Sequence, residues 1–120
     1  MGDLTENFSR REFACKCGCG KDNISRLLVD KLQLMRTHIR RPISIASGVR
    51  CAAHNKTSGG KPNSAHLTGD AVDIVVSGGS ERKEIVDAAR YYGLNRVGVA
   101  RSFVHVDISK TLPQDVLWVY

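Results

Sequence analysis

Two histidines and an aspartate occur at positions where they could bind a metal ion together. His66 and Asp73 lie seven residues apart, and His105 follows in a later apolar segment. Two neutral imidazoles and one carboxylate form the donor set of a catalytic zinc site, which keeps a further position for water. The spacing excludes the helical zinc motif with two histidines four residues apart, so a loop must carry His66. The sequence therefore predicts one Zn²⁺ ion bound by His66, Asp73 and His105.

The segments that carry Asp73 and His105 alternate in hydrophobicity, as half-buried strands do. In residues 71–76, Val72, Ile74 and Val76 share one face, and Asp73 lies on the other with Ala71 and Val75. In residues 102–108, His105 and Asp107 share the face opposite the β-branched residues. If these two strands pair, Asp73 and His105 meet across the ladder.

The pattern Ser-x-His-x-x-Gly-x-Ala-x-Asp starts at Ser64 and is followed by a histidine in a late strand. It resembles the zinc D-alanyl-D-alanine carboxypeptidases and endolysin peptidases. The similarity extends over residues 8–118 and includes Ser47-Gly48-Val49-Arg50-Cys51, His54-Asn55, Gly59-Gly60 and Phe103 to Asp107. This resemblance implies that Arg50 binds a substrate carboxylate, a task that suits the guanidinium fork. Ser64 and His54 are our further candidates for contact with the substrate.

The general base of better-known members of that family is missing from its usual position. Those members carry Glu or Asp three residues before the last zinc histidine, or His two residues before it. Ser102 and Phe103 occupy these positions here, and neither accepts a proton at neutral pH. Asp107 shares the face of His105 and is our candidate catalytic base. Its alternative role is to orient His105, and His54 is a weaker candidate base.

Two functions follow from these residues. The first is a zinc peptidase that hydrolyses D-amino-acid-containing stem peptides of peptidoglycan, either as a D-Ala-D-Ala carboxypeptidase or as a murein endopeptidase of the endolysin kind. The second is a non-catalytic zinc-containing binding module, similar to the hedgehog signalling domain. Hydrolysis of peptidoglycan peptides by the zinc-loaded protein would distinguish them.

Apolar residues at helical spacing predict two helices. One spans about 25–39, with Asn23 as its N-cap, and the other runs from Ser80 as N-cap to Tyr92, where Gly93 stops it. Residues 52–63 are rich in Gly, Ser and Asn and predict an irregular active-site loop.

Strands are predicted at 43–47, at 71–76 and near Val97 and Val104. The order of elements predicts an α+β fold: a small, mostly antiparallel sheet with helices packed on one face and the zinc site on the other. A length of 120 residues suffices for one hydrophobic core. We therefore expect a single zinc peptidase domain over residues 1–120, and a monomer.

The four cysteines of the chain leave three states open. Cys15, Cys17 and Cys19 form a C-x-C-x-C run, which differs from the C-x-x-C spacing of structural zinc motifs. A second metal site, a disulfide between Cys51 and one of these three, and reduced thiols each remain compatible with the sequence.

The formal net charge of +6 favours adsorption to an anionic envelope polymer. The basic residues are scattered and lack interleaved aromatics, so we expect no specific nucleic-acid partner. No apolar stretch approaches the ~20 residues of a membrane span, so we expect no membrane insertion. The amino terminus lacks the features of a secretory signal. We expect synthesis in the cytoplasm and action at the cell wall, with two explanations left open: lysin-like release, or a chain that is a processed or excised domain.

Overall fold

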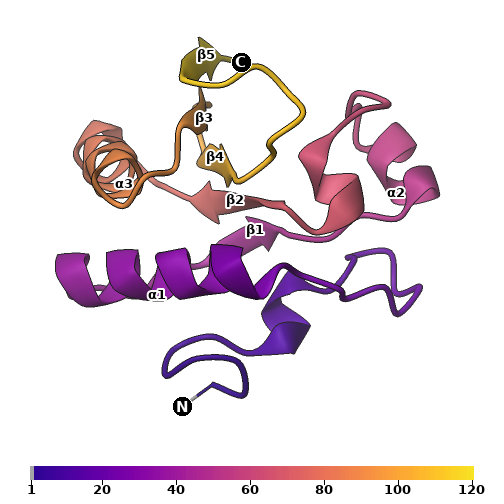
Figure 1. Cartoon of the computed structure of the whole chain (residues 1–120), viewed down its shortest axis with the longest axis horizontal. Coiled ribbons are helices and arrows are strands. Elements are labelled where there is room, and N and C mark those ends of the chain that lie inside the picture. The colour runs from indigo at the N-terminus through magenta and orange to yellow at the C-terminus, as the bar shows by residue number, and fades with distance from the viewer. Residues whose placement is uncertain (1) are drawn as a thin grey trace.

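A mixed sheet of five strands, with the order β1-β2-β4-β3-β5, organises the chain (Figure 1). The computed structural model describes residues 2–120. In chain order the elements are the 3-10 helix η1 Arg10–Phe13, α1 Arg26–Ile39, β1 Ile45–Ser47, α2 Ala52–Thr57, the 3-10 helix η2 Ala65–Thr68, β2 Ala71–Val75, α3 Gly79–Tyr91, β3 Arg96–Val99, β4 Phe103–Asp107 and β5 Val116–Val119.

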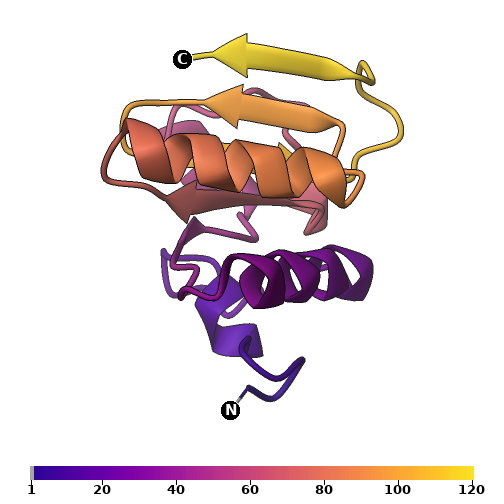
Figure 2. The same ribbon diagram turned by 90° about the vertical axis from the view of Figure 1, so that its left-hand side faces the viewer.

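The sheet confirms the predicted α+β fold and corrects its strand directions. Neighbouring strands are antiparallel in the pairs β1·β2, β2·β4 and β3·β4, but β5 runs parallel to β3. The prediction of a mostly antiparallel sheet lacked this fifth strand. The chain leaves β4 and crosses back to the far side of β3, which makes β5 an edge strand opposite β1 (Figure 2).

The two long helices cover one face of the sheet, as predicted. Leu32 and Met35 of α1 and Ala89 of α3 pack with Ile74 and Val104 in one buried apolar cluster. The polar residues of β2 and β4 therefore lie on the opposite face. None of the helices in residues 2–120 combines the length and the apolar character needed to cross a membrane.

Both predicted helix caps were misplaced. The N-cap of α1 is Ser25 rather than Asn23, and its hydroxyl accepts a hydrogen bond from the amide of Leu28 at 3.4 Å. The amide of Ser25 donates to the carbonyl of Gly69, which fixes it outside the helix. Ser80 lies inside α3, whose N-cap is Gly78. The predicted end of that helix is confirmed, because Gly93 adopts a φ of 82° after the last turn.

Residues 52–63 are more ordered than predicted. They begin with helix α2, whose N-cap is Cys51, and they pass through a turn at Gly59. Figure 1 shows α2 on the side of the sheet opposite α3. A short helix thus stands where an irregular loop was expected, because the Cys51 sulfur accepts a hydrogen bond from the amide of His54 and starts the first turn.

Candidate active site

The side chains of His66, Asp73 and His105 converge on the face of the sheet opposite the core. We call these three residues the His-Asp-His cluster. Asp73 and His105 are direct partners across β2 and β4, which confirms the predicted cross-strand meeting. Oδ1 of Asp73 lies 3.0 Å from Nδ1 of His105 and 3.3 Å from Nε2 of His66. One potential ligand atom from each residue lies within 4.8 Å of the others.

Hydrogen bonds on the outer sides of the two imidazoles select which nitrogen faces the cluster. Nδ1 of His66 lies 2.7 Å from the carbonyl oxygen of Gly48, an acceptor that requires a proton on this nitrogen. Nε2 of His105 lies 2.7 Å from Oδ2 of Asp107. Nε2 of His66 and Nδ1 of His105 then face Asp73. In the neutral tautomers that the outer acceptors select, each of these nitrogens carries a lone pair that could bind a metal, as in many zinc sites with an outer carbonyl or carboxylate. The donor set fits zinc.

Asp107 is enclosed by its partners. Its side chain is inaccessible to solvent, and Oδ1 accepts hydrogen bonds from Nε of Arg96 at 2.8 Å and from the amide of Ser109 at 3.0 Å. Oδ2 contacts the nitrogen of His105 that faces away from Asp73. Both oxygens are occupied, so the carboxylate is placed to hold the His105 ring.

Two opposing effects set the protonation of the cluster. Burial alone would raise the pKa of Asp73, but hydrogen bonds and charge from His105 and His66 hold it well below its usual range. Burial would lower the pKa of His105, but hydrogen bonds to Asp107 and Asp73 raise it above the ordinary value. Two carboxylates therefore flank His105 and provide the negative potential that a divalent cation requires.

Arg50 lies directly beside the cluster. Its Nη2 donates to Oδ2 of Asp73 at 3.1 Å, while Nε donates to Oγ of Ser47 at 3.1 Å and Nη1 to Oδ1 of Asn55 at 3.3 Å. The guanidinium is mostly buried, with 13% of its side chain exposed. These three bonds leave one N–H on each terminal nitrogen, so a carboxylate can still be bound by two donors.

The family model of peptidase M15 matches residues 6–107, a span that includes Arg50 and the whole His-Asp-His cluster. The chain belongs to the peptidase M15 family. A search of curated proteins gave no match. M15 peptidases are zinc-dependent, and this M15 chain is accordingly a zinc metallopeptidase with a donor set that fits the ion.

Ser64 and His54, our candidates for substrate contact in this M15 peptidase, have local structural roles. The hydroxyl of Ser64 caps η2 by accepting a hydrogen bond from the amide of His66 at 3.2 Å. His54 lies in the first turn of α2. Within residues 2–120, no hydrogen bond or ion pair joins the His54 ring to the cluster. Ser64 therefore supports the position of His66, and a contact of either side chain with substrate stays a prediction.

Some residues that support the site were not predicted from the sequence. Gly48 orients His66 through a backbone carbonyl, which carries no side-chain signal. Asn55 is buried and donates from Nδ2 to the carbonyl of Lys61 at 2.9 Å while its Oδ1 faces Arg50. Arg96 had a sequence signal, because strand alternation places it with Gly98 on one face of the strand near Val97. Its pairing with Asp107 was not predicted, because Asp107 had been interpreted as a candidate catalytic base.

An aromatic wall borders the cluster on the side of β5. In the sheet register Gly98 lies opposite both His105 and Trp118, so the three residues form one row. A Cβ on Gly98 would come within 2.6 Å of the indole, and without it the Trp118 ring reaches to 5.3 Å from the His105 ring. Tyr120 and Phe103 extend the wall, with ring centroids 5.0 Å apart. The signal for this strand was the uninterrupted run of β-branched, apolar and aromatic residues at 116–120.

We expect Gly69→Ala to destabilise the protein more than Gly59→Ala. Both glycines have positive φ, 76° and 77°, so each alanine carries a similar backbone cost of about 1–2 kcal/mol. At Gly69 the added Cβ would also lie 2.1 Å from the carbonyl oxygen of Asn23, whereas nothing lies within 4 Å at Gly59. Urea unfolding of both variants measures the difference, and equal midpoints would contradict the close contact.

Proposed function

We propose that this M15 peptidase hydrolyses D-amino-acid-containing stem peptides of peptidoglycan, as a D-Ala-D-Ala carboxypeptidase or a murein endopeptidase. The supporting observation is the position of Arg50, whose guanidinium contacts Asp73 of the His-Asp-His cluster. A carboxylate held by Arg50 lies beside the residues that would bind the metal. Stem peptides offer such carboxylates, and the formal net charge of +6 favours residence on an anionic envelope.

His66, Asp73 and His105 would hold one zinc ion in this proposal. When bound, zinc supplies Lewis acidity, which polarises a peptide carbonyl and makes water a nucleophile at neutral pH. The chain's own residues prepare for this chemistry. Gly48 and Asp107 keep the two histidines in the tautomers that present a free nitrogen, and Arg50 positions the substrate carboxylate.

For Asp107 the surroundings support the orienting role over the role of general base. A general base must reach the proton that it removes, either directly or through one water. Asp107 is buried, and both of its oxygens already accept hydrogen bonds from the protein. We therefore assign Asp107 to positioning His105.

Mass spectrometry of purified peptidoglycan digested with zinc-loaded protein tests the proposed reaction. Metal-dependent release of free D-Ala would identify a carboxypeptidase, and new ends within the stem peptides or cross-links would identify an endopeptidase. The His66→Ala variant serves as the control without the metal site. Absence of any product from a zinc-occupied protein would contradict the proposal and favour the binding module.

We expect Arg50→Lys to lower kcat/KM about 10- to 100-fold, because lysine keeps the charge but loses the second donor of the fork. The loss should be concentrated on peptides with a free carboxylate, so that the preference for carboxylate over carboxamide ends falls. Kinetics on matched peptides with either end measure this preference. Arg26→Lys, at an exposed position on α1, is the control. An unchanged preference in Arg50→Lys would contradict the carboxylate-binding role.

A further inference from the structure

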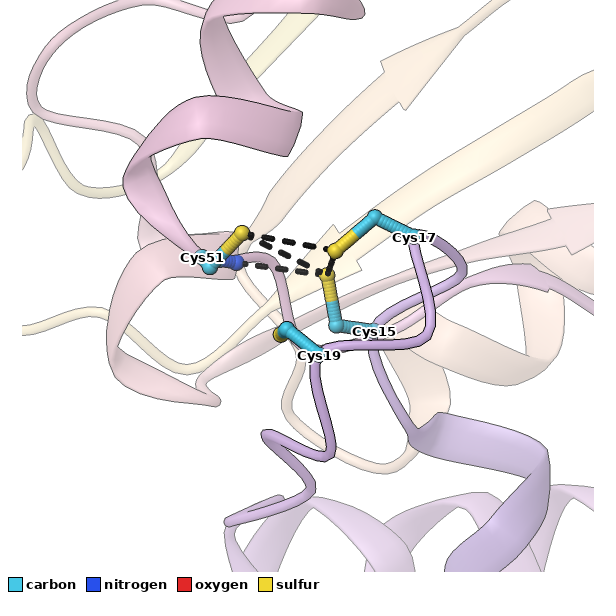
Figure 3. A group of neighbouring side chains, drawn as sticks. All are labelled: Cys15, Cys17, Cys19 and Cys51. Carbon is cyan, nitrogen blue, oxygen red and sulfur yellow. Dashed lines mark hydrogen bonds between the residues drawn. The ribbon is translucent and has the colours of Figure 1, made fainter.

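The four cysteines of the chain converge into a second cluster, separate from the His-Asp-His cluster. We call Cys15, Cys17, Cys19 and Cys51 the thiol cluster. Figure 3 shows the sulfur atoms of Cys15, Cys17 and Cys51 pointing toward one another. Their separations are 3.4 Å for Cys15 and Cys17, 3.6 Å for Cys17 and Cys51, and 3.8 Å for Cys15 and Cys51. All four sulfur atoms lie within 4.8 Å of one another.

These separations match the geometry of a tetrahedral metal site. A Zn–S bond of about 2.3 Å in a regular tetrahedron places neighbouring sulfur atoms about 3.8 Å apart. A disulfide would need about 2.0 Å, and all four cysteines are free. Three thiols that are nearly equidistant are not arranged as a pair, and a disulfide could use only two of them.

The backbone of residues 15–21 explains how C-x-C-x-C can replace the usual C-x-x-C spacing. In an extended chain the alternate sulfur atoms would point the same way but lie about 6.6 Å apart. Here the chain turns at Gly18 and Gly20, whose φ angles are 83° and 90°, and the amide of Cys15 donates to the carbonyl of Lys21 at 2.8 Å. The loop therefore folds back on itself and gathers its three cysteines.

Cys51 joins this loop to the segment that carries Arg50. The Cys51 amide donates to the sulfur of Cys15 at 3.4 Å, and the Cys51 sulfur accepts from the amide of His54 at 3.4 Å. Residues 16–20 of the loop are exposed and have no apolar core of their own. Such a loop needs a cross-link if it is to be held in one position.

We propose that the thiol cluster binds a structural zinc ion through Cys15, Cys17, Cys19 and Cys51. This ion is distinct from the one at the His-Asp-His cluster. Four thiolates complete a tetrahedral site and leave no open position for water, so the role of this site is to hold the structure. It fixes the amino-terminal loop against the turn that presents Arg50.

Cobalt substitution of the wild-type protein tests this proposal without any variant. Thiolate ligands give Co²⁺ an intense charge-transfer band in the near ultraviolet, which imidazole and carboxylate ligands do not give. We expect this band in the wild type and in His66→Ala, whose thiols are intact. We expect its loss or marked reduction in Cys17→Ser, together with a fall in zinc content from about two ions per chain to about one.

Three results would overturn the proposal. One is a wild-type protein that binds Co²⁺ without the charge-transfer band. Another is intact-mass evidence for a disulfide in the protein isolated without oxidant. The third is equal reactivity of the four thiols with a thiol reagent in the presence and absence of zinc. If Cys17→Ser does not fold, the wild-type cobalt spectrum and the zinc-dependent thiol protection still decide the question.

Discussion

Replacing His105 with alanine is expected to abolish tight zinc binding at the His-Asp-His cluster and, with it, peptide hydrolysis. The substitution removes one of the three donors that the sheet register brings together. Loss of a residue that only orients a metal ligand costs about 10- to 100-fold in affinity, so loss of the ligand itself should exceed that range. Hydrolysis should fall by at least about 10³-fold, because several kcal/mol of charge stabilisation are lost. His66→Ala should behave in the same way.

Zinc titration followed by fluorescence measures this loss directly. Trp118 is the only tryptophan of the chain, and its ring lies 5.3 Å from that of His105. The matched control is His38→Ala. His38 is exposed, and its ring stacks on Tyr91 rather than on a residue of the His-Asp-His cluster. Retention of wild-type zinc affinity at this site in His105→Ala would refute the assigned ligand set.

Replacing Asp107 with alanine should cost both stability and metal affinity, for separate reasons. Arg96 would lose its buried partner, and breaking such a pair by removing one member costs about 3–5 kcal/mol. His105 would lose the acceptor that fixes its tautomer, which should weaken zinc binding about 10- to 100-fold. If Asp107 acts only by orienting His105, saturating zinc should restore much of kcat.

The value of kcat for Asp107→Ala at saturating zinc thus distinguishes the orienting role of Asp107 from the role of general base. A general base cannot be replaced by added metal, so a kcat that stays low in a folded, zinc-occupied Asp107→Ala protein would contradict the orienting role. Asp107→Asn is the second variant, since it preserves the volume if the alanine protein does not fold. Asp30→Asn, on the exposed surface of α1, controls for the loss of one carboxylate.

The arrangement of the His-Asp-His cluster was predictable because strand alternation carries strong information. Once Asp73 was placed on the face opposite Val72 and His105 on the face opposite Val104, pairing of the two strands was enough to bring them together. The resemblance of the Ser64 to Asp73 pattern supplied His66, whose loop position has no periodic signal. The helical faces and the α+β fold followed from the same kind of periodicity.

Features that depend on the backbone alone could not be predicted in this way. The carbonyl of Gly48 contacts His66 because the chain turns there, and any residue has a carbonyl. The N-cap of α1 shifted from Asn23 to Ser25 because a tertiary hydrogen bond from the Ser25 amide to Gly69 selected it. Convergence of Cys51 with the C-x-C-x-C run depends on a contact between segments more than thirty residues apart.

The segment from Ser47 to Cys51 contacts both clusters, and this links the free energies of metal binding at the two. Gly48 and Arg50 contact His66 and Asp73, while Cys51 belongs to the thiol cluster. Ordering this turn from either side lowers the entropy that remains to be lost at the other. If both clusters bind zinc as proposed, we expect positive cooperativity between them. Linkage then requires that the factor by which one occupied site tightens the other equals the factor in the opposite direction.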